Sequence, residues 1–183
     1  MNKKLLIVVD FQVDFVSGAL GFNKAKELDD KIYRKINEYK SNNDLVIYTF
    51  DTHDQNYLST VEGKYLPIKH CIDQSEGHHL YGKVATTFDE NKDIYFKKET
   101  FPSLDLANYL KGKEFTSVEL CGLVSNICVL SNAIMVKSAL PNTEIFVNKE
   151  LTSSFDEKLN QECFDILKGL HINVIGSNDE KNC

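Results

Sequence analysis

The chain has 183 residues, of which 42% are hydrophobic and 26% charged, and its formal net charge at pH 7 is −6. This ordinary globular balance excludes a fibrous, largely disordered or membrane-embedded protein. The length suits one substantial core, so we expect residues 1–183 to form a single domain. No run of Lys and Arg is longer than a pair. We therefore expect no nucleic-acid partner and no membrane partner.

The first residues carry two lysines ahead of an apolar run, but that run is short and ends at Asp10. This pattern predicts a strand rather than a signal peptide, and no apolar stretch reaches the roughly 18 residues that a membrane-spanning helix needs. The five cysteines are scattered, without a Cys-x-x-Cys pair, which disfavours a disulfide framework or a Cys-rich zinc site. We expect a cytoplasmic location.

Strand and helix patterns alternate along the chain. The predicted strands cover residues 5–9, 44–50, 93–96, 118–121, 144–147 and 172–175, and the predicted helices cover 25–40, 104–110, 128–137 and 155–170. Continuous apolar strands are typical of a parallel sheet that is buried on both faces. We predict an α/β fold of three layers, with helices on both faces of a mostly parallel sheet of about six strands.

Two further patterns lead to expectations about packing and loops. Six apolar residues of the last predicted helix fall on one side, which we expect to be buried: Phe155, Leu159, Cys163, Ile166, Leu167 and Leu170. Between the second and third strands, about forty residues show no clear periodicity. Loops of this length in a compact domain are usually functional.

The segment 118–130 (VELCGLVSNICVL) runs from a strand through a glycine and a small polar turn into a helix. With Ser125 or Asn126 as the N-cap, Cys128 would lie in the first helical turn. Unpaired N–H groups and the helix dipole there would lower the thiol pKa and favour a thiolate nucleophile. The alternative is core packing, which this segment alone favours, because free cysteines are among the most buried residues.

The carboxyl ends of parallel strands share one edge of a sheet, so Asp10, Lys98 and Cys128 are expected to converge there. A thiol beside an ammonium and a carboxylate forms a nucleophilic set in which Lys98 favours the thiolate and Asp10 transfers protons. Taken singly, Asp10 would be a solvated strand-end acid and Lys98 a surface lysine in a charged pair. No histidine other than His53 follows a strand, which disfavours a papain-like Cys-His pair.

Nitrogen and oxygen ligands follow the second strand. The candidate set is Asp51, His53, Glu62 and His70. Such a set suits zinc, iron or manganese rather than a metal that prefers sulfur. His78 and His79 are rival ligands, ranked lower because adjacent side chains seldom point at one metal.

These motifs resemble those of the isochorismatase-like cysteine hydrolases, and within them the nicotinamidase (pyrazinamidase) branch. The resemblance runs from about residue 5 to 175. It is carried by VVDFQVDF at 8–15, KETFPSL at 98–104, GLVSNICV at 122–129 and LTSSFDE at 151–157. The chain departs from the family pattern in having Ser125-Asn126 before the cysteine, PIKH at 67–70, and Pro102-Ser-Leu104 after the lysine.

The resemblance implies roles for these residues. Asp10 would be the catalytic acid and base, Lys98 the catalytic lysine and Cys128 the nucleophile. A cis peptide bond would join residues 123 and 124, and the amides of Val124 and Cys128 would form the oxyanion hole.

The resemblance also implies how substrate and metal would bind. Phe15 would stack on the substrate ring, and Tyr65 stands in for a second pocket aromatic. The set Asp51, His53, Glu62 and His70 would hold one divalent metal ion, with zinc as the first choice and iron or manganese as alternatives, and the metal would bind a pyridine nitrogen.

The implied activity is metal-dependent hydrolysis of nicotinamide to nicotinate and ammonia through a cysteine thioester. One alternative is a related cysteine hydrolase for another small amide, ureide or carbamoyl compound. A second is a redox protein in which Cys128 is oxidised to a sulfenic acid. The family commonly assembles as dimers or tetramers, so the resemblance also implies a homo-oligomer.

Overall fold

A computed structural model describes residues 3–176, and the residues before and after this range lie outside the description. Its six strands form one sheet in the order β3-β2-β1-β4-β5-β6, and all neighbours are parallel. The strands are β1 (Leu5–Val9), β2 (Leu45–Asp51), β3 (Ile94–Lys98), β4 (Ser117–Leu123), β5 (Glu144–Ser153) and β6 (Asn173–Ile175). The predicted parallel sheet of about six strands is confirmed.

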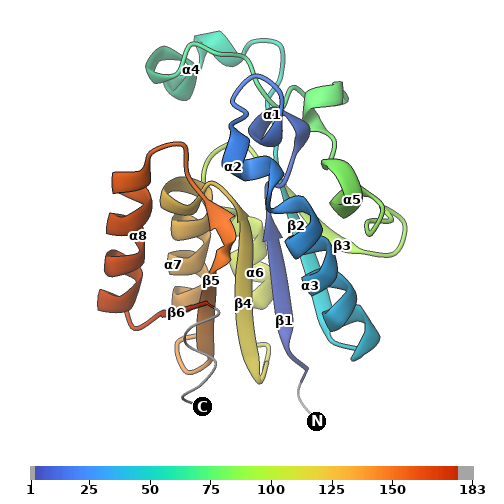
Figure 1. The fold of residues 1–183 in the computed structure, drawn as a ribbon, viewed down its shortest axis with the longest axis vertical. Coiled ribbons are helices and arrows are strands. Elements are labelled where there is room, and N and C mark those ends of the chain that lie inside the picture. The colour runs from blue at the N-terminus through green and yellow to red at the C-terminus, as the bar shows by residue number, and fades with distance from the viewer. Residues whose placement is uncertain (1–2, 177–183) are drawn as a thin grey trace.

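Helices cover both faces of this sheet (Figure 1). They are α1 (Val13–Val16), α2 (Asn23–Lys26), α3 (Asp29–Ser41), α4 (Val61–Tyr65), α5 (Gly82–Ala85), α6 (Leu104–Leu110), α7 (Leu130–Ala139) and α8 (Glu157–Gly169). One core lies between the sheet and α3, and the other lies between the sheet and α6, α7 and α8. Alternate residues of β1 point into opposite cores, as strand geometry requires. The predicted three-layer architecture is confirmed.

Some element boundaries differ from the prediction. The helix expected over residues 25–40 is two helices, α2 and α3, and β5 continues six residues past the expected end at Val147. The extension of β5 carries polar residues that obscure the strand pattern, and a register shift between Leu120 and Gly122 of β4 lies opposite it. The polar residues therefore removed the strand pattern from the sequence of this extension, although backbone pairing with β4 stabilises it as a strand.

The expected apolar side of the last helix is confirmed only for Cys163 and Leu167, which are buried. Phe155, Leu159, Ile166 and Leu170 are exposed, and the buried contacts of α8 are made by Cys163, Phe164 and Leu167. A narrow stripe of the helix therefore meets the core, and Phe155 instead packs edge-on against Phe22.

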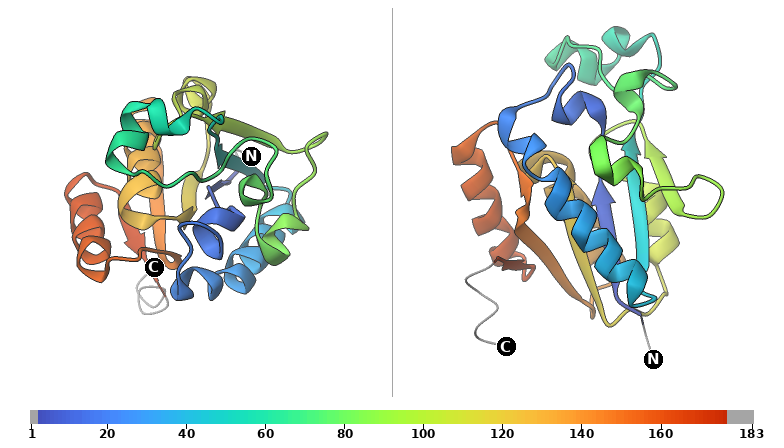
Figure 2. Two further views of the ribbon diagram at one scale, coloured as in Figure 1. Left: turned by 90° about the horizontal axis from the view of Figure 1, so that it is seen from above. Right: turned by 45° about the vertical axis from the view of Figure 1, so that its right-hand side comes forward.

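The segment between β2 and β3 lies over the carboxyl end of the sheet as far as His78, and its later part, with α5, packs beside α3 (Figures 1 and 2). It contains the short 3-10 helices η1 (Tyr57–Ser59) and η2 (Glu76–His78) together with α4 and α5. The part as far as His78 therefore forms the roof over the edge where the predicted site residues lie. Within residues 3–176, no helix has both the length and the apolar character of a membrane span.

A buried acid in the sheet gives a test of the packing. Glu119 on β4 accepts hydrogen bonds from the Tyr39 hydroxyl at 2.8 Å and from the Asn148 amide at 3.2 Å. Replacing Tyr39 with Phe leaves a buried carboxylate oxygen without this donor, so we expect the free energy of unfolding to fall by about 1–3 kcal/mol in urea titrations. The control is Tyr33→Phe on the same helix, whose hydroxyl makes no hydrogen bond within the described range. Equal losses in both variants would contradict the role of the Glu119 bond.

Candidate active site

The predicted catalytic residues meet at the carboxyl ends of adjacent strands. Asp10 directly follows β1, Asp51 ends β2 and Lys98 ends β3, with Asp51 and Lys98 paired in register. Cys128 lies beyond β4, which pairs with β1 on the other side. The structure therefore brings together residues that are up to 118 positions apart in the sequence.

Lys98 is the hub of this group. Its ammonium nitrogen lies 2.6 Å from Asp10 Oδ2, 3.0 Å from Asp51 Oδ1 and 3.8 Å from Cys128 Sγ. Burial lowers the pKa of Lys98, but the two carboxylates and the sulfur raise it by more, so this pKa lies well above its ordinary value. The surroundings of Lys98 therefore favour its ammonium form, which contacts both acids and the Cys128 sulfur.

Asp10 is fully buried, and its other oxygen accepts a hydrogen bond of 2.6 Å from the Thr49 hydroxyl. Burial raises the pKa of Asp10, and nearby Asp51 raises it further, against the lowering effect of Lys98. A carboxylate with a raised pKa accepts a proton more readily than an ordinary aspartate, so Asp10 is suited to proton transfer.

Cys128 is only 5% exposed and lies in η3 (Ser125–Val129), a π-helical turn ahead of α7. Burial raises the pKa of Cys128 well above its ordinary value; Lys98 lowers it, and Asp10 and Asp51 raise it. The expected lowering of this pKa is therefore wrong, because burial and the carboxylates outweigh the ammonium. Asp10 also lies within hydrogen-bonding reach of the Cys128 side chain, so it is placed to accept the proton of the thiol.

The turn before Cys128 contains the implied cis peptide bond, between Leu123 and Val124. The preceding Gly122 has a φ of 110°, and a Cβ there would lie 2.0 Å from the Val9 carbonyl oxygen. Glycine is thus required for β4 to approach β1 closely where the nucleophile turn begins.

The four candidate metal ligands also converge. One ligand atom from each of Asp51, His53, Glu62 and His70 lies within 4.8 Å of all the others. Asp51 Oδ2 is 3.1 Å from His53 Nε2 and 3.4 Å from His70 Nε2. Glu62 Oε1 lies 3.7 Å and 3.8 Å from the same two nitrogens.

Two features show that this cluster fits a divalent cation. The His70 Nδ1–H donates to the Ile68 carbonyl at 2.8 Å, which leaves the Nε2 lone pair directed at the cluster. Glu62 Oε2 is buried and has no hydrogen-bond partner in the part of the chain described. A buried carboxylate oxygen without a donor is costly unless an ion satisfies it.

The rival histidines lie outside the cluster. His78 is buried, but its Nε2 hydrogen-bonds with the Thr52 hydroxyl at 2.9 Å. His79 is largely exposed and lies 3.6 Å from Glu76. The lower rank given to this pair agrees with the structure.

The two predicted pocket aromatics differ in placement. The Phe15 ring lies 5.5 Å from the His70 ring, beside the cluster, although Phe15 is not among the residues that line the cavity. Tyr65 is 89% exposed and does not line the cavity, because α4 directs Glu62 inward while its last residue faces solvent. The aromatic that packs on the ligands is Tyr57, whose ring lies 4.6 Å from that of His53. Sequence reasoning missed Tyr57, and its only signal was a position four residues after His53.

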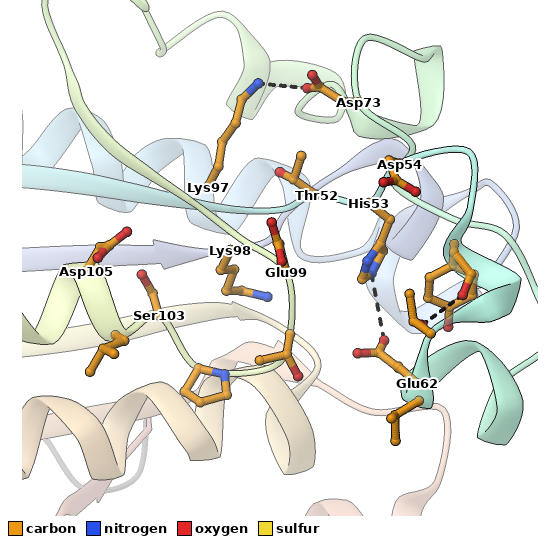
Figure 3. Close-up of a pocket in the computed structure, with 16 residues that line it drawn as sticks. Thr52, His53, Asp54, Glu62, Asp73, Lys97, Lys98, Glu99, Ser103 and Asp105 are labelled. Carbon is orange, nitrogen blue, oxygen red and sulfur yellow. Dashed lines mark hydrogen bonds and ion pairs between the residues drawn. The ribbon is translucent and has the colours of Figure 1, made fainter.

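A cavity of about 840 Å³ opens beside these residues (Figure 3). His53 and Glu62 line one side, and Lys98 and Ser103 line the opposite side. Lys98 thus contributes to the cavity wall and also lies within 3.8 Å of the Cys128 sulfur. A small molecule in the cavity would contact His53 and Glu62 of the ligand cluster as well as Lys98.

Comparison with known proteins agrees with this geometry. The family model for the isochorismatase domain matches residues 4–178, so the chain belongs to the isochorismatase family. An uncharacterized isochorismatase family protein of Bacillus subtilis, PncA, is 28% identical over 166 residues, which cover 85% of this chain and 89% of that protein. A nicotinamidase of Acinetobacter baylyi is 26% identical over 175 residues, or 80% of each chain. The crystal structure of a pyrazinamidase/nicotinamidase from Streptococcus mutans, 25% identical, superposes with a TM-score of 0.84 over 94% of this chain and 100% of that one.

Two neighbouring lysines test the importance of the hub. Lys98→Met leaves Asp10 and Asp51 buried without their cation, so we expect the free energy of unfolding to fall by about 3–5 kcal/mol. Lys97 pairs with Asp73 at 2.7 Å at the surface, so Lys97→Met should cost less than about 1 kcal/mol. Both values come from urea titrations with a chelator present, so that bound metal does not compensate. Similar losses in the two variants would contradict the assignment of Lys98 as the hub.

Proposed function

We propose that this protein is a metal-dependent nicotinamidase that hydrolyses nicotinamide to nicotinate and ammonia. The observation that carries the proposal is the sharing of Asp51 between two groups. One oxygen of Asp51 binds Lys98 of the nucleophilic set, and the other lies against the two imidazoles of the ligand cluster. A pyridine ring held at the cluster would therefore present its carboxamide near Cys128. Relatives that carry the name nicotinamidase support the same assignment.

The metal would be held by Asp51, His53, Glu62 and His70. When bound, a divalent ion such as zinc supplies a Lewis acid that binds a ring nitrogen and so selects aromatic heterocyclic amides. Phe15, beside His70, would pack on the ring of the substrate.

The first half of the reaction forms a thioester. Cys128 Sγ attacks the carboxamide carbon, and its proton passes to Asp10, whose raised pKa suits it to this role. The negative oxygen of the tetrahedral intermediate accepts hydrogen bonds from the Val124 and Cys128 amides. Asp10 then protonates the leaving nitrogen, the C–N bond breaks, and ammonia departs.

The second half releases the acid. Asp10, again ionised, removes a proton from a water molecule that attacks the thioester carbon. The C–S bond breaks, the sulfur regains its proton from Asp10, and nicotinate is released. Lys98 holds Asp10 and Cys128 in place throughout.

The alternatives are less well supported. A redox-sensing thiol is typically exposed and has a low pKa, whereas Cys128 is buried and burial raises its pKa. A related cysteine hydrolase for ureides or carbamoyl compounds would use the same nucleophile, so Cys128 does not distinguish it from a nicotinamidase. The charge of the cavity does, where the alternative substrate carries a carboxylate.

The cavity wall is acidic. Its charged residues are Asp54, Glu62, Asp73, Glu99, Asp105, Lys97 and Lys98. Five carboxylates against two ammonium groups leave an excess of negative charge, which disfavours substrates that carry a carboxylate. Nicotinamide is neutral and enters without this penalty, and its anionic product is repelled.

The nucleophile is tested by ammonia release from nicotinamide with and without added zinc, iron or manganese. We expect Cys128→Ala to lower kcat by at least about 1000-fold, because no other group forms the thioester. The control is Cys121→Ala, a buried cysteine of β4 whose thiol donates to the Ile7 carbonyl, which should remain active. Near-normal turnover by Cys128→Ala would overturn the mechanism, and inactivity of the wild type with every metal would overturn the substrate assignment.

The charge of the cavity is tested with Glu99→Gln combined with Asp105→Asn. We expect nicotinate to inhibit this double variant roughly two- to fivefold more strongly, because exposed charges contribute up to about 1 kcal/mol. Raising the salt concentration should shrink the difference. The control, Glu162→Gln with Asp165→Asn on α8, makes the same change in net charge away from the cavity. An equal effect in the control would mean that net charge, and not the cavity wall, governs inhibition.

A further inference from the structure

The short helix α1 and the residue before it contact the segments that carry the metal ligands. Gln12 is fully buried, and its Nε2 donates to the carbonyl oxygens of Asp51 and His78, both at 2.9 Å. Its Oε1 accepts from the Asp51 amide at 2.8 Å. Gln12 thus forms two hydrogen bonds with the backbone of Asp51 and, through the His78 carbonyl, connects it to the roof segment.

Asp14 makes the corresponding contact with the other ligand segment. Its Oδ2 accepts from the Cys71 amide at 2.7 Å, directly after His70, and its Oδ1 accepts from the Ala19 amide at 3.1 Å. Cys71 has a φ of 45°, a left-handed conformation that is costly for a residue with a side chain. The hydrogen bond that Asp14 accepts from the Cys71 N–H stabilises this turn, which directs His70 into the cluster.

The roof segment leaves room for Asp14. A Cβ at Gly77 would lie 2.0 Å from Asp14 Oδ2, so only glycine admits the carboxylate here. A third ligand is connected to the same turn, because the Cys71 carbonyl accepts a hydrogen bond from the His53 amide at 3.0 Å. The side chains of Gln12 and Asp14 are therefore connected by hydrogen bonds to the backbone at or next to three of the four candidate ligands, Asp51, His53 and His70.

We infer that Gln12 and Asp14 are positioning residues for the metal site. They bind the backbone beside Asp51 and His70, and they hold these side chains in a ligating arrangement before the ion arrives. Neither residue touches the candidate ligand atoms, so their effect is on metal affinity rather than on the ligand set. The inference rests on the proposed function, in which this cluster binds a divalent ion.

The test is the dissociation constant for zinc and for manganese, measured on the full chain by competition with a chromophoric chelator. We expect Gln12→Met and Asp14→Ala to weaken binding by about 10- to 100-fold, the range typical for groups that orient metal ligands. Gly77→Ala, which displaces Asp14 without deleting it, should also weaken binding and serves where either other variant fails to fold.

Asn132 provides a matched control on the nucleophile side. It is also a fully buried amide with three hydrogen bonds, which involve Ser103 N at 3.0 Å, Phe101 O at 3.1 Å and Cys128 O at 2.8 Å. Asn132→Leu should lower stability in urea to a similar extent as Gln12→Met while keeping the metal affinity of the wild type.

The outcomes separate this inference from the proposed function. If the wild type binds neither zinc nor manganese, the metal-dependent function fails and the inference falls with it. If the wild type binds metal and the folded Gln12, Asp14 and Gly77 variants bind it equally well, the inference alone is overturned. Equal weakening in Asn132→Leu would also overturn it, because a general loss of rigidity would then explain the effect.

Discussion

The site depends on one buried ammonium group between two buried carboxylates. Asp10 and Asp51 end neighbouring strands of the sheet, and without a cation their charges would repel each other in a region from which water is largely excluded. Lys98 contacts both acids, and it also reaches Cys128. The ion pairs therefore join the ends of β1, β2 and β3 and place the nucleophile in the same network. The side chains proposed to be catalytic are therefore also the ones that support the ends of these strands.

The charges of the site also explain why a divalent ion fits beside it. With Asp10, Asp51 and Glu62 ionised and Lys98 protonated, three negative charges face one positive charge, which leaves −2. A divalent cation at the cluster would balance this excess, whereas the imidazoles of His53 and His70 supply neutral nitrogen ligands. The nucleophilic set and the ligand cluster are thus electrostatically dependent on each other through Asp51.

Strands and helices that a local pattern of apolar residues marks could be predicted from the sequence. Features that depend on contacts between distant segments without such a pattern could not. Apolar runs predicted the strand Leu5–Val9 and the helix Leu104–Leu110 with the observed bounds, and the rule for parallel sheet edges predicted that Asp10, Lys98 and Cys128 would meet. The roof segment has no periodicity, so nothing in the sequence showed that Tyr57 packs on the ligands while Tyr65 faces solvent. The pKa of Cys128 depends on depth of burial, which no local pattern reports.

In the segment 10–14, each of the three polar side chains matches the hydrogen-bonding groups that it faces. In the proposed mechanism Asp10 both accepts and releases a proton, which a carboxylate does and an amide does not. Gln12 must pair with the N–H and the C=O of the same residue, and its side-chain amide offers a donor and an acceptor on separate atoms. Asp14 faces backbone N–H groups of Cys71 and Ala19, for which an ionised carboxylate is the stronger acceptor. Exchanging Gln12 with either acid would place a carboxylate oxygen against the carbonyl oxygens of Asp51 and His78, so the amide between the two acids follows from the groups that it faces.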